Sequence, residues 1–243
     1  MSRFYYFILF VFLYSCDKQI VVKPKAKDIY SYIKDKNGNS YKTIKIGNQT
    51  WMVENLKSTK CVYKEGYMKQ EKDDIRTLLP SDTSMMYFID TNKYAPYSLQ
   101  WPYNGVDTFS KTYGRLYTWP AVKDQRNICP TGWRIPSVQD WEKIISFLGG
   151  YELAGGKMKE VSSYWSKPNT DASNTSFFSA RGGAYRNEYG YFTPLLKSGY
   201  WWTSTEDDED TSSAFAYSLN ASSGKIFKVS KLKKQALSVR CIL

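Results

Sequence analysis

The stretch CPTGWRIPSVQDWEKI, residues 129–144, constrains the fold more than any other part of this chain. Ser137 followed by Asp140 is a capping-box pattern, which marks the first turn of a helix. Arg134, just before the helix, is placed to bind a carboxylate or a backbone carbonyl. Gly149-Gly150 ends the helix, and its apolar residues recur on one face: Val138, Trp141, Ile144, Ile145 and Leu148.

Both ends of the domain show the period-two alternation that is typical of antiparallel strands. Asn37-Gly38 separates residues 29–34 from residues 41–46, which predicts a hairpin, and residues 50–56 add a third segment. Four more strands are predicted near the other end, at residues 199–205, 213–219, 225–230 and 236–242.

The segments between these strands carry many turn residues. Residues 57–112 and 151–198 predict long irregular loops, which are often functional in a domain of this size. Residues 113–126 predict a first short helix, with Thr118 as its N-cap. We find no internal repeat and no second hydrophobic core, so residues 29–243 are expected to form one domain.

The first residues have the pattern of a bacterial lipoprotein signal peptide. The apolar run from Phe4 to Tyr14 would rise only about 16 Å as a helix, too short for a hydrocarbon core of about 30 Å. Leu13-Tyr14-Ser15-Cys16 resembles a lipobox, and Cys16 would then receive the lipid. We therefore expect residues 1–15 to be removed and residues 16–28 to form a tether. A plain signal peptide that happens to contain a cysteine is the alternative.

This pattern predicts an exported lipoprotein that contacts a membrane through its lipid anchor. We expect an anchor in the outer membrane of the cell envelope, although Asp17 would favour the inner membrane under enterobacterial sorting rules, and the face stays open. The formal charge is +11, but the lysines are scattered and no recognition helix is visible. No nucleic-acid partner is expected.

The cysteines predict one disulfide. If Cys16 is acylated, then Cys61, Cys129 and Cys241 remain, and a pair is expected to oxidise in an exported protein. Cys129 lies before the predicted helix, and Cys241 lies in the last predicted strand. We therefore predict the pair Cys129–Cys241 and a free Cys61, and a bond from Cys61 to either partner is the alternative.

The chain contains no histidine, which excludes several kinds of catalytic site. A Ser-His-Asp triad, a Cys-His pair and a histidine-ligated zinc all need that side chain. No spacing of carboxylates points to glycoside hydrolysis. We therefore expect a protein that is not an enzyme.

Six motifs occur in order between residues 41 and 241: YKTIKIGNQTWMVENLK, YGRLYTW, CPTGWRIPSVQDWEKI, FFSARGGAYR, GYWWTSTE and SVRC. Together they resemble the Fibrobacter succinogenes major paralogous domain, a family of exported proteins and lipoproteins. That family is similar to the C-type lectin fold, which formylglycine-generating enzymes also use. The resemblance implies an α+β, C-type-lectin-like domain with twisted antiparallel sheets, two short helices and long irregular loops. It also implies a disulfide between the region before the second helix and the last strand, and it implies no known activity.

The lectin-like resemblance suggests two kinds of ligand site. Aromatic side chains stack on sugars, although strand alternation directs one of Trp201 and Trp202 to the core. The candidates are Trp101, Trp165, Tyr185, Tyr200, Trp201 and Trp202. C-type lectins hold calcium in loops at this end of the sheet, so an acidic run is a candidate calcium site, with Glu206, Asp207, Asp208 and Asp210 as ligands. A solvated hairpin tip is the alternative for this run, and no other cofactor is expected.

These expectations lead to three hypotheses on function. The first is a non-enzymatic envelope lipoprotein that presents its domain for binding a glycan or a protein. The second is a structural subunit of a surface fibre or envelope complex. The third is a catalytic remnant of a formylglycine-generating enzyme, which is disfavoured because those enzymes use neighbouring cysteines and only Cys61 would be unpaired here.

Overall fold

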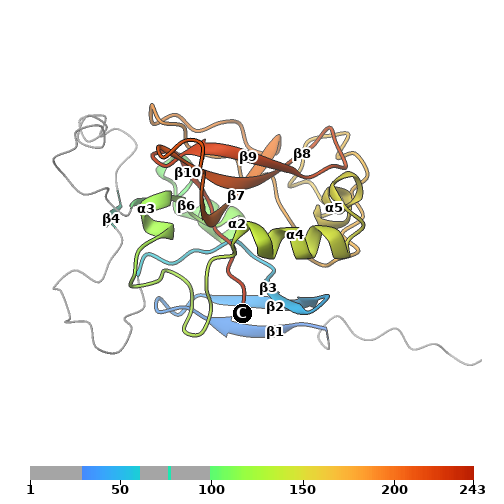
Figure 1. Ribbon diagram of the computed structural model, residues 1–243, viewed down its shortest axis with the longest axis horizontal. Helices are drawn as coiled ribbons and strands as arrows, with labels where there is room; N and C mark the ends of the chain where they lie inside the picture. Colours follow the sequence, from blue (N-terminus) through green and yellow to red (C-terminus); the bar gives the residue numbers. More distant parts are fainter. Residues whose placement is uncertain (1–28, 61–75, 78–98) are drawn as a thin grey trace, which may run out of the picture.

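The computed structural model describes residues 29–60, 76–77 and 99–243. The expected signal peptide, the tether, Cys16 and Cys61 lie outside these residues. Two β-sheets, mostly antiparallel, and a few short helices give an α+β fold, which confirms the predicted class (Figure 1). In the part of the chain that the structure describes, no helix is both long enough and apolar enough to span a bilayer.

The small sheet comes from the predicted hairpin and its third segment. Its antiparallel strands are β1 (Ser31–Lys34), β2 (Ser40–Ile46) and β3 (Gln49–Met52), in that spatial order. The turn between β1 and β2 is held by Asp35, whose Oδ1 accepts a hydrogen bond of 2.9 Å from the backbone N–H of Asn37. Such a local acceptor replaces the ladder bonds that a turn lacks.

The large sheet has the order β4-β5-β6-β10-β7-β8-β9. Its neighbours are antiparallel except for the pairs β4–β5 and β10–β7, which are parallel. The four strands predicted near residues 199–242 are confirmed, with shifted bounds. The strands are β4 (Arg76–Thr77), β5 (Leu99–Trp101), β6 (Leu116–Thr118), β7 (Ser198–Glu206), β8 (Ser213–Asn220), β9 (Phe227–Leu232) and β10 (Ala236–Ser238).

Beyond β10 the chain crosses from the large sheet to the small one (Figure 1). Leu56 donates its backbone N–H to the carbonyl of Val239 at 2.8 Å, and Met52 donates to the carbonyl of Cys241 at 3.0 Å. The strand predicted as residues 236–242 is therefore divided: its first part pairs within the large sheet, and its second part joins the two sheets.

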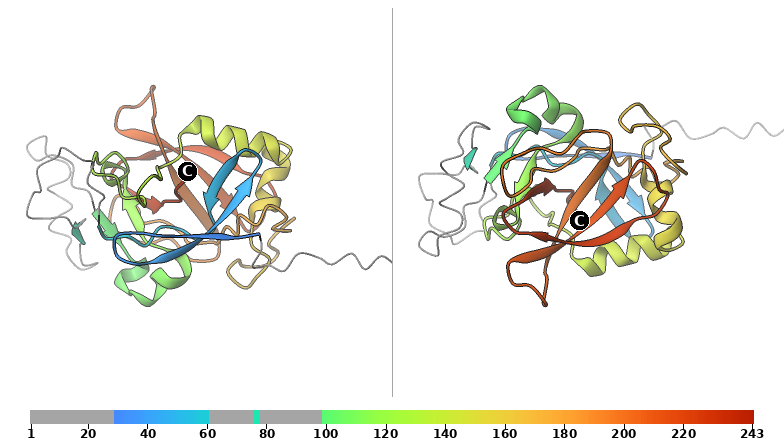
Figure 2. Two further views of the ribbon diagram at one scale, coloured as in Figure 1. Left: turned by 90° about the horizontal axis from the view of Figure 1, so that it is seen from below. Right: turned by 90° about the horizontal axis from the view of Figure 1, so that it is seen from above.

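Four α-helices lie within the described residues: α2 (Thr108–Tyr113), α3 (Trp119–Val122), α4 (Val138–Phe147) and α5 (Tyr151–Met158). The two predicted helices are α3 and α4. Ser137 caps α4 as predicted, whereas Thr118 occupies the N-cap position of α3 without a capping hydrogen bond, because its hydroxyl accepts the backbone N–H of Leu99. The other two lie in segments that were predicted to be irregular. In both views of Figure 2, α2 and α4 lie on opposite sides of the molecule.

Helix α4 begins as its sequence predicts. The backbone N–H of Asp140 donates to Ser137 Oγ at 3.2 Å, and the backbone N–H of Ser137 donates to Asp140 Oδ2 at 2.8 Å. Arg134 binds the same carboxylate through Nη1 at 2.6 Å and Nη2 at 3.0 Å. All five predicted core positions of the helix are buried. The opening motif is therefore structural: it starts α4 and fixes it to the sheets.

We expect the capping carboxylate to make stability depend on pH below pH 4. Burial alone would raise the pKa of Asp140, but hydrogen bonds from Arg134 and Ser137 outweigh it and lower the pKa from 3.8 to about 2. As the pH falls, the Asp140 carboxylate is protonated in the unfolded chain before it is protonated in the folded chain. The stabilisation that this carboxylate gives the folded state is therefore present above about pH 4 and is lost as the pH falls to about 2. Urea unfolding should show a loss on the order of 1 kcal/mol from this group.

Asp140→Asn is the matched variant for this test. An amide cannot ionise, so the stability difference between the variant and the wild type should shrink as the pH falls from 4 to 2. A difference that stays constant over this range would contradict the assignment.

Helix α5 corrects the prediction that residues 151–198 begin as an irregular loop. The pair Gly155-Gly156 suggested a break in the chain, because glycine disfavours helices. In the structure these glycines permit close packing instead. A Cβ at Gly155 would lie 2.4 Å from the backbone oxygen of Lys225. Tertiary packing therefore overrides helix propensity here.

Replacing Gly155 with alanine should lower the free energy of unfolding by about 1–3 kcal/mol, as overpacking does, although alanine gains about 1 kcal/mol of helix propensity. Urea unfolding measures the change. Gly183→Ala is the control, because a Cβ at Gly183 would meet its neighbours at ordinary contact distances of 3.6 Å or more. Equal effects of the two substitutions would contradict the role given to Gly155.

Lys159 orders the irregular segment that follows α5. Its buried Nζ donates to three backbone carbonyls, of Thr170 at 2.7 Å, Ser223 at 2.8 Å and Asn220 at 3.1 Å. Burial lowers the pKa of Lys159 to about 8, so its ammonium remains charged at neutral pH. One side chain thus ties the segment after α5 to the connection between β8 and β9.

The hydrophobic core has two main parts, one on each face of β7 and β8. The first contains Trp202, Ala216 and the disulfide between Cys129 and Cys241. The second contains Trp201 and Tyr217, packed against the apolar face of α4. Because neighbouring strand residues point to opposite faces, burial of both tryptophans means that both faces of this sheet are covered.

Candidate functional site

The structure removes four of the six predicted sugar-stacking residues from consideration. Trp101, Trp165, Trp201 and Trp202 are each at most 3% exposed, so their rings have no face available to a ligand. Three of them bind backbone or side-chain oxygens through the indole N–H: Trp165 to Ala180, Trp201 to Asn55 and Trp202 to Tyr117. Strand alternation allows at most one of Trp201 and Trp202 to be available, and in the structure neither is, because both faces of the sheet are covered.

Tyr185 and Tyr200 are half-buried and contact one another, with ring centroids 4.8 Å apart. The ammonium of Lys231 lies 4.3 Å from the first ring centroid and 4.7 Å from the second. A cation of the chain itself therefore covers these rings. The six aromatic candidates do not form one platform.

The acidic run does not form the predicted calcium site. Asp207 accepts hydrogen bonds from Ser230 and from the backbone of Glu209, and Asp210 accepts from Ser212 and Ser213. Glu206 pairs with Lys233 at 3.3 Å. Among residues 29–60, 76–77 and 99–243, no group of three or more histidine, cysteine, aspartate or glutamate side chains is placed to hold a metal ion.

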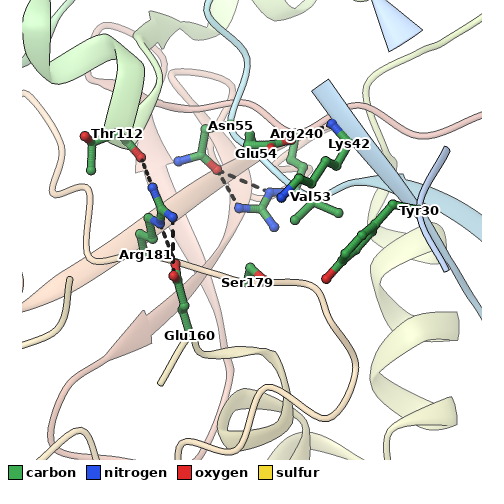
Figure 3. Close-up of a pocket in the computed structure, with 10 residues that line it drawn as sticks. All are labelled: Tyr30, Lys42, Val53, Glu54, Asn55, Thr112, Glu160, Ser179, Arg181 and Arg240. Atoms are coloured by element: carbon green, nitrogen blue, oxygen red, sulfur yellow. Dashed lines mark hydrogen bonds and ion pairs between the residues drawn. The ribbon is translucent and has the colours of Figure 1, made fainter. Parts of the chain in front are cut away.

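A polar pocket of about 120 Å³ lies where the small sheet meets α2, the segment after α5 and the segment after β10 (Figure 3). It is lined by three basic and two acidic side chains together with neutral residues. The lining residues are Tyr30, Lys42, Val53, Glu54, Asn55, Thr112, Glu160, Ser179, Arg181 and Arg240. None of them was among the predicted site residues.

Asn55 and Arg240 form the inner wall of this pocket. Arg240 is 1% exposed, and it donates to Asn55 Oδ1 through Nη2 at 2.9 Å and Nε at 3.2 Å. The same oxygen accepts the indole N–H of Trp201 at 2.8 Å, and Asn55 Nδ2 donates to the carbonyl of Tyr113 at 2.8 Å. One amide thus joins the motifs WMVENL, GYWWTST and SVRC.

The alternation of the segment after β10 explains how Arg240 reaches this position. Val239 and Cys241 belong to the core around the disulfide, and Ile242 belongs to the core beside α4. Arg240 therefore points to the same side as Ile242, away from the disulfide. Its guanidinium stacks on Phe178, 4.0 Å from the ring centroid.

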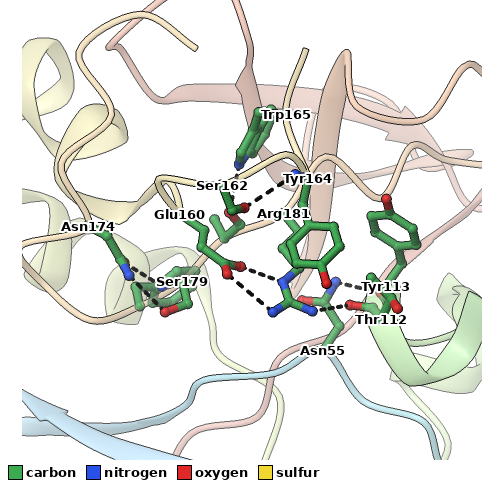
Figure 4. Close-up of polar contacts among 12 residues, drawn as sticks. Asn55, Thr112, Tyr113, Glu160, Ser162, Tyr164, Trp165, Asn174, Ser179 and Arg181 are labelled. Atoms are coloured by element: carbon green, nitrogen blue, oxygen red, sulfur yellow. Dashed lines mark hydrogen bonds and ion pairs between the residues drawn. The ribbon is translucent and has the colours of Figure 1, made fainter. Parts of the chain in front are cut away.

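Glu160 and Arg181 form the opposite wall (Figure 4). A backbone hydrogen bond of 3.0 Å from Glu160 N–H to the carbonyl of Ala180 brings the two residues together. Both carboxylate oxygens of Glu160 accept hydrogen bonds from Arg181. Arg181 also donates to the carbonyl of Thr112 at 3.0 Å and stacks on Tyr164, 4.0 Å from its ring centroid. This pair is held as a rigid unit.

The charges of the pocket act on the buried arginine. Burial lowers the pKa of Arg240 to about 9; the carboxylates of Glu54 and Glu160 oppose this shift, and Arg181 adds to it. Arg240 remains a cation at neutral pH. The pocket thus presents a cluster of opposite charges whose positions are fixed by hydrogen bonds.

The sequence carries a signal for this site. Asn55, Arg181 and Arg240 are polar residues in motifs that otherwise consist largely of apolar or small residues. A polar residue in a core segment needs a partner. Asn55 and Arg240 bind one another, and Arg181 binds Glu160.

The chain was compared with known protein families, curated proteins and solved structures. No curated protein and no solved structure matches the chain. The family model described as the Fibrobacter succinogenes major domain matches residues 44–243, which contain most of the pocket and the disulfide. The chain therefore belongs to the Fibrobacter succinogenes major domain family.

Proposed function

We propose that this protein is a non-enzymatic lipoprotein of the cell envelope that presents a C-type-lectin-like domain for binding a glycan or protein ligand. The observation that carries the proposal is the charged pocket of Figure 3. Its walls are fixed by the Asn55–Arg240 and Glu160–Arg181 hydrogen bonds, so the pocket is formed before any ligand arrives. Ligand sites are usually largely formed before the ligand binds, with a few polar groups placed to orient it.

A binding role suits the side chains better than a catalytic one. Both oxygens of Glu160 are engaged by Arg181, which fixes the position of this carboxylate. Among the described residues no cysteine thiol remains, because Cys129 and Cys241 are joined. The disulfide between the segment before α4 and the segment after β10 also supports the lectin-like assignment.

A glycan array probed with the full chain in mild detergent tests this proposal. We expect selective binding to a few glycans, and we expect it to persist with a chelator, since the acidic loop forms hydrogen bonds within the chain. Uniformly blank arrays, together with stable co-purification of envelope proteins, would instead favour the assembly subunit. Turnover of a bound glycan would contradict the non-enzymatic role.

The proposed anchor has its own test. Mass spectrometry of the purified protein should find a lipid-modified Cys16 as the first residue. The variant Cys16→Ser should be released from the membrane fraction. An unmodified Cys16 in a cleaved protein would indicate a plain signal peptide and leave the binding role untouched.

A further inference from the structure

The most buried cation of the pocket has no acidic partner. In the described part of the chain, Arg240 forms no ion pair, and its hydrogen bonds go only to the amide oxygen of Asn55 and the backbone carbonyl of Phe178. These bonds use three of the five N–H groups of a guanidinium. A buried charge that is compensated only by neutral oxygens is costly, and an anion brought by a ligand would be stabilised beside it.

The other charges of the pocket do not cancel Arg240. Glu160 is neutralised by Arg181. The ammonium of Lys42 lies over Tyr30, 5.3 Å from its ring centroid, and Glu54 accepts the backbone N–H of the same lysine at 2.8 Å. Once the Glu160–Arg181 pair is set aside, two cations face one carboxylate. The pocket therefore has a surplus positive charge and one carboxylate that can accept ligand hydroxyls.

The rim of the pocket is aromatic. Tyr30 is half-buried, and its ring packs edge-to-face against Phe177, which is 43% exposed, with centroids 6.3 Å apart. An exposed aromatic rim beside hydrogen-bonding groups suits a sugar ring, which has an apolar face and polar edges. The volume of about 120 Å³ is below the ~300–1,000 Å³ of pockets that enclose a drug-sized ligand. It suits a single residue of a longer chain.

We propose that this pocket binds a carboxylate-bearing sugar residue of a glycan. The carboxylate lies at Arg240 and Lys42, a hydroxyl donates to Glu54, and the sugar ring rests against the exposed ring of Phe177, since the Lys42 ammonium lies over Tyr30. A guanidinium fork matches the geometry of a carboxylate. This inference rests on the proposed binding function and narrows it to one class of ligand.

The direct test compares a hexuronic acid oligosaccharide with the same oligosaccharide after its carboxylates are reduced to alcohols. Calorimetry with the full chain in detergent should show binding that is about ten- to hundredfold weaker for the reduced compound, since charge-assisted hydrogen bonds are lost. Binding of the acidic form should also weaken as salt is raised.

Variants at the rim keep the test independent of folding. Lys42 is exposed, so Lys42→Gln should leave the melting temperature unchanged and weaken binding of the acidic oligosaccharide about tenfold. Lys45→Gln, an exposed lysine on the same strand outside the pocket, is the matched control and should bind as the wild type does. Arg240→Lys keeps the positive charge but removes the paired N–H groups of the guanidinium, so it should also weaken binding of the acidic oligosaccharide.

Three results would overturn the inference. Equal affinity for the acidic and reduced oligosaccharides would show that the carboxylate is not recognised. Wild-type affinity in Lys42→Gln would place the ligand elsewhere. Preference for a peptide C-terminal carboxylate over its amide, without sugar binding, would assign the pocket to a protein ligand and leave the broader proposal intact. Only the absence of binding to every glycan and envelope protein would remove both proposals.

Discussion

Replacing Asn55 with leucine is expected to lower the free energy of unfolding by about 3–5 kcal/mol, because the change leaves a buried charge and a buried indole without their acceptor. Asn55 Oδ1 accepts hydrogen bonds from both Arg240 and Trp201, and all three side chains are at most 5% exposed. Leucine has a similar size but no acceptor. Urea unfolding followed by tryptophan fluorescence measures the loss.

Asn48→Leu is the control for this substitution. Asn48 is exposed in the turn between β2 and β3, so its replacement should change stability by less than about 0.5 kcal/mol. A loss below about 1 kcal/mol for Asn55→Leu would mean that water or another group satisfies Arg240, and the pocket wall would need another explanation.

Removing the disulfide is expected to have an effect of similar size. Cys129 and Cys241 are separated by 112 positions, with Cα atoms 6.0 Å apart. Closing a loop of that length restricts the unfolded chain, and the chain-entropy model gives about 4–5 kcal/mol for it. The double variant Cys129→Ala/Cys241→Ala should lose up to this amount in urea unfolding.

Cys61→Ala is the matched control, because Cys61 is predicted to be unpaired. It should unfold at the urea concentration of the wild type, and the reduced wild type should behave like the double variant. If Cys61→Ala were as damaging as the double variant, the cysteine pairing would be different from the one described.

Elements that depend on neighbouring residues were predictable from the sequence. The capping box at Ser137 and Asp140 and the apolar face of α4 are local patterns, and the structure confirms them. The β1–β2 hairpin follows from Asn37-Gly38 in the same way. Helix α5 was missed because the role of Gly155 depends on Lys225, a contact that no local rule contains.

The candidate site could not be predicted from spacing. Sequence reasoning chose tryptophans as ligand residues because alternation assumes that one face of a strand meets solvent, yet both faces of β7 are covered. It chose the acidic run because its residues are adjacent, yet they bind their own loop. The pocket instead combines Asn55, Arg181 and Arg240, which only the folded topology brings together.

The crossing from β10 to the small sheet has a consequence for how the binding surface arises. Arg240 and Asn55 are separated by 185 positions, and the same crossing joins the two sheets. Contacts between such distant residues slow folding, since much of the chain must be ordered before they form. The pocket therefore needs both ends of the domain in place, and no fragment that lacks either end can display it. An incompletely folded domain would therefore show no ligand binding at all, rather than binding of reduced affinity.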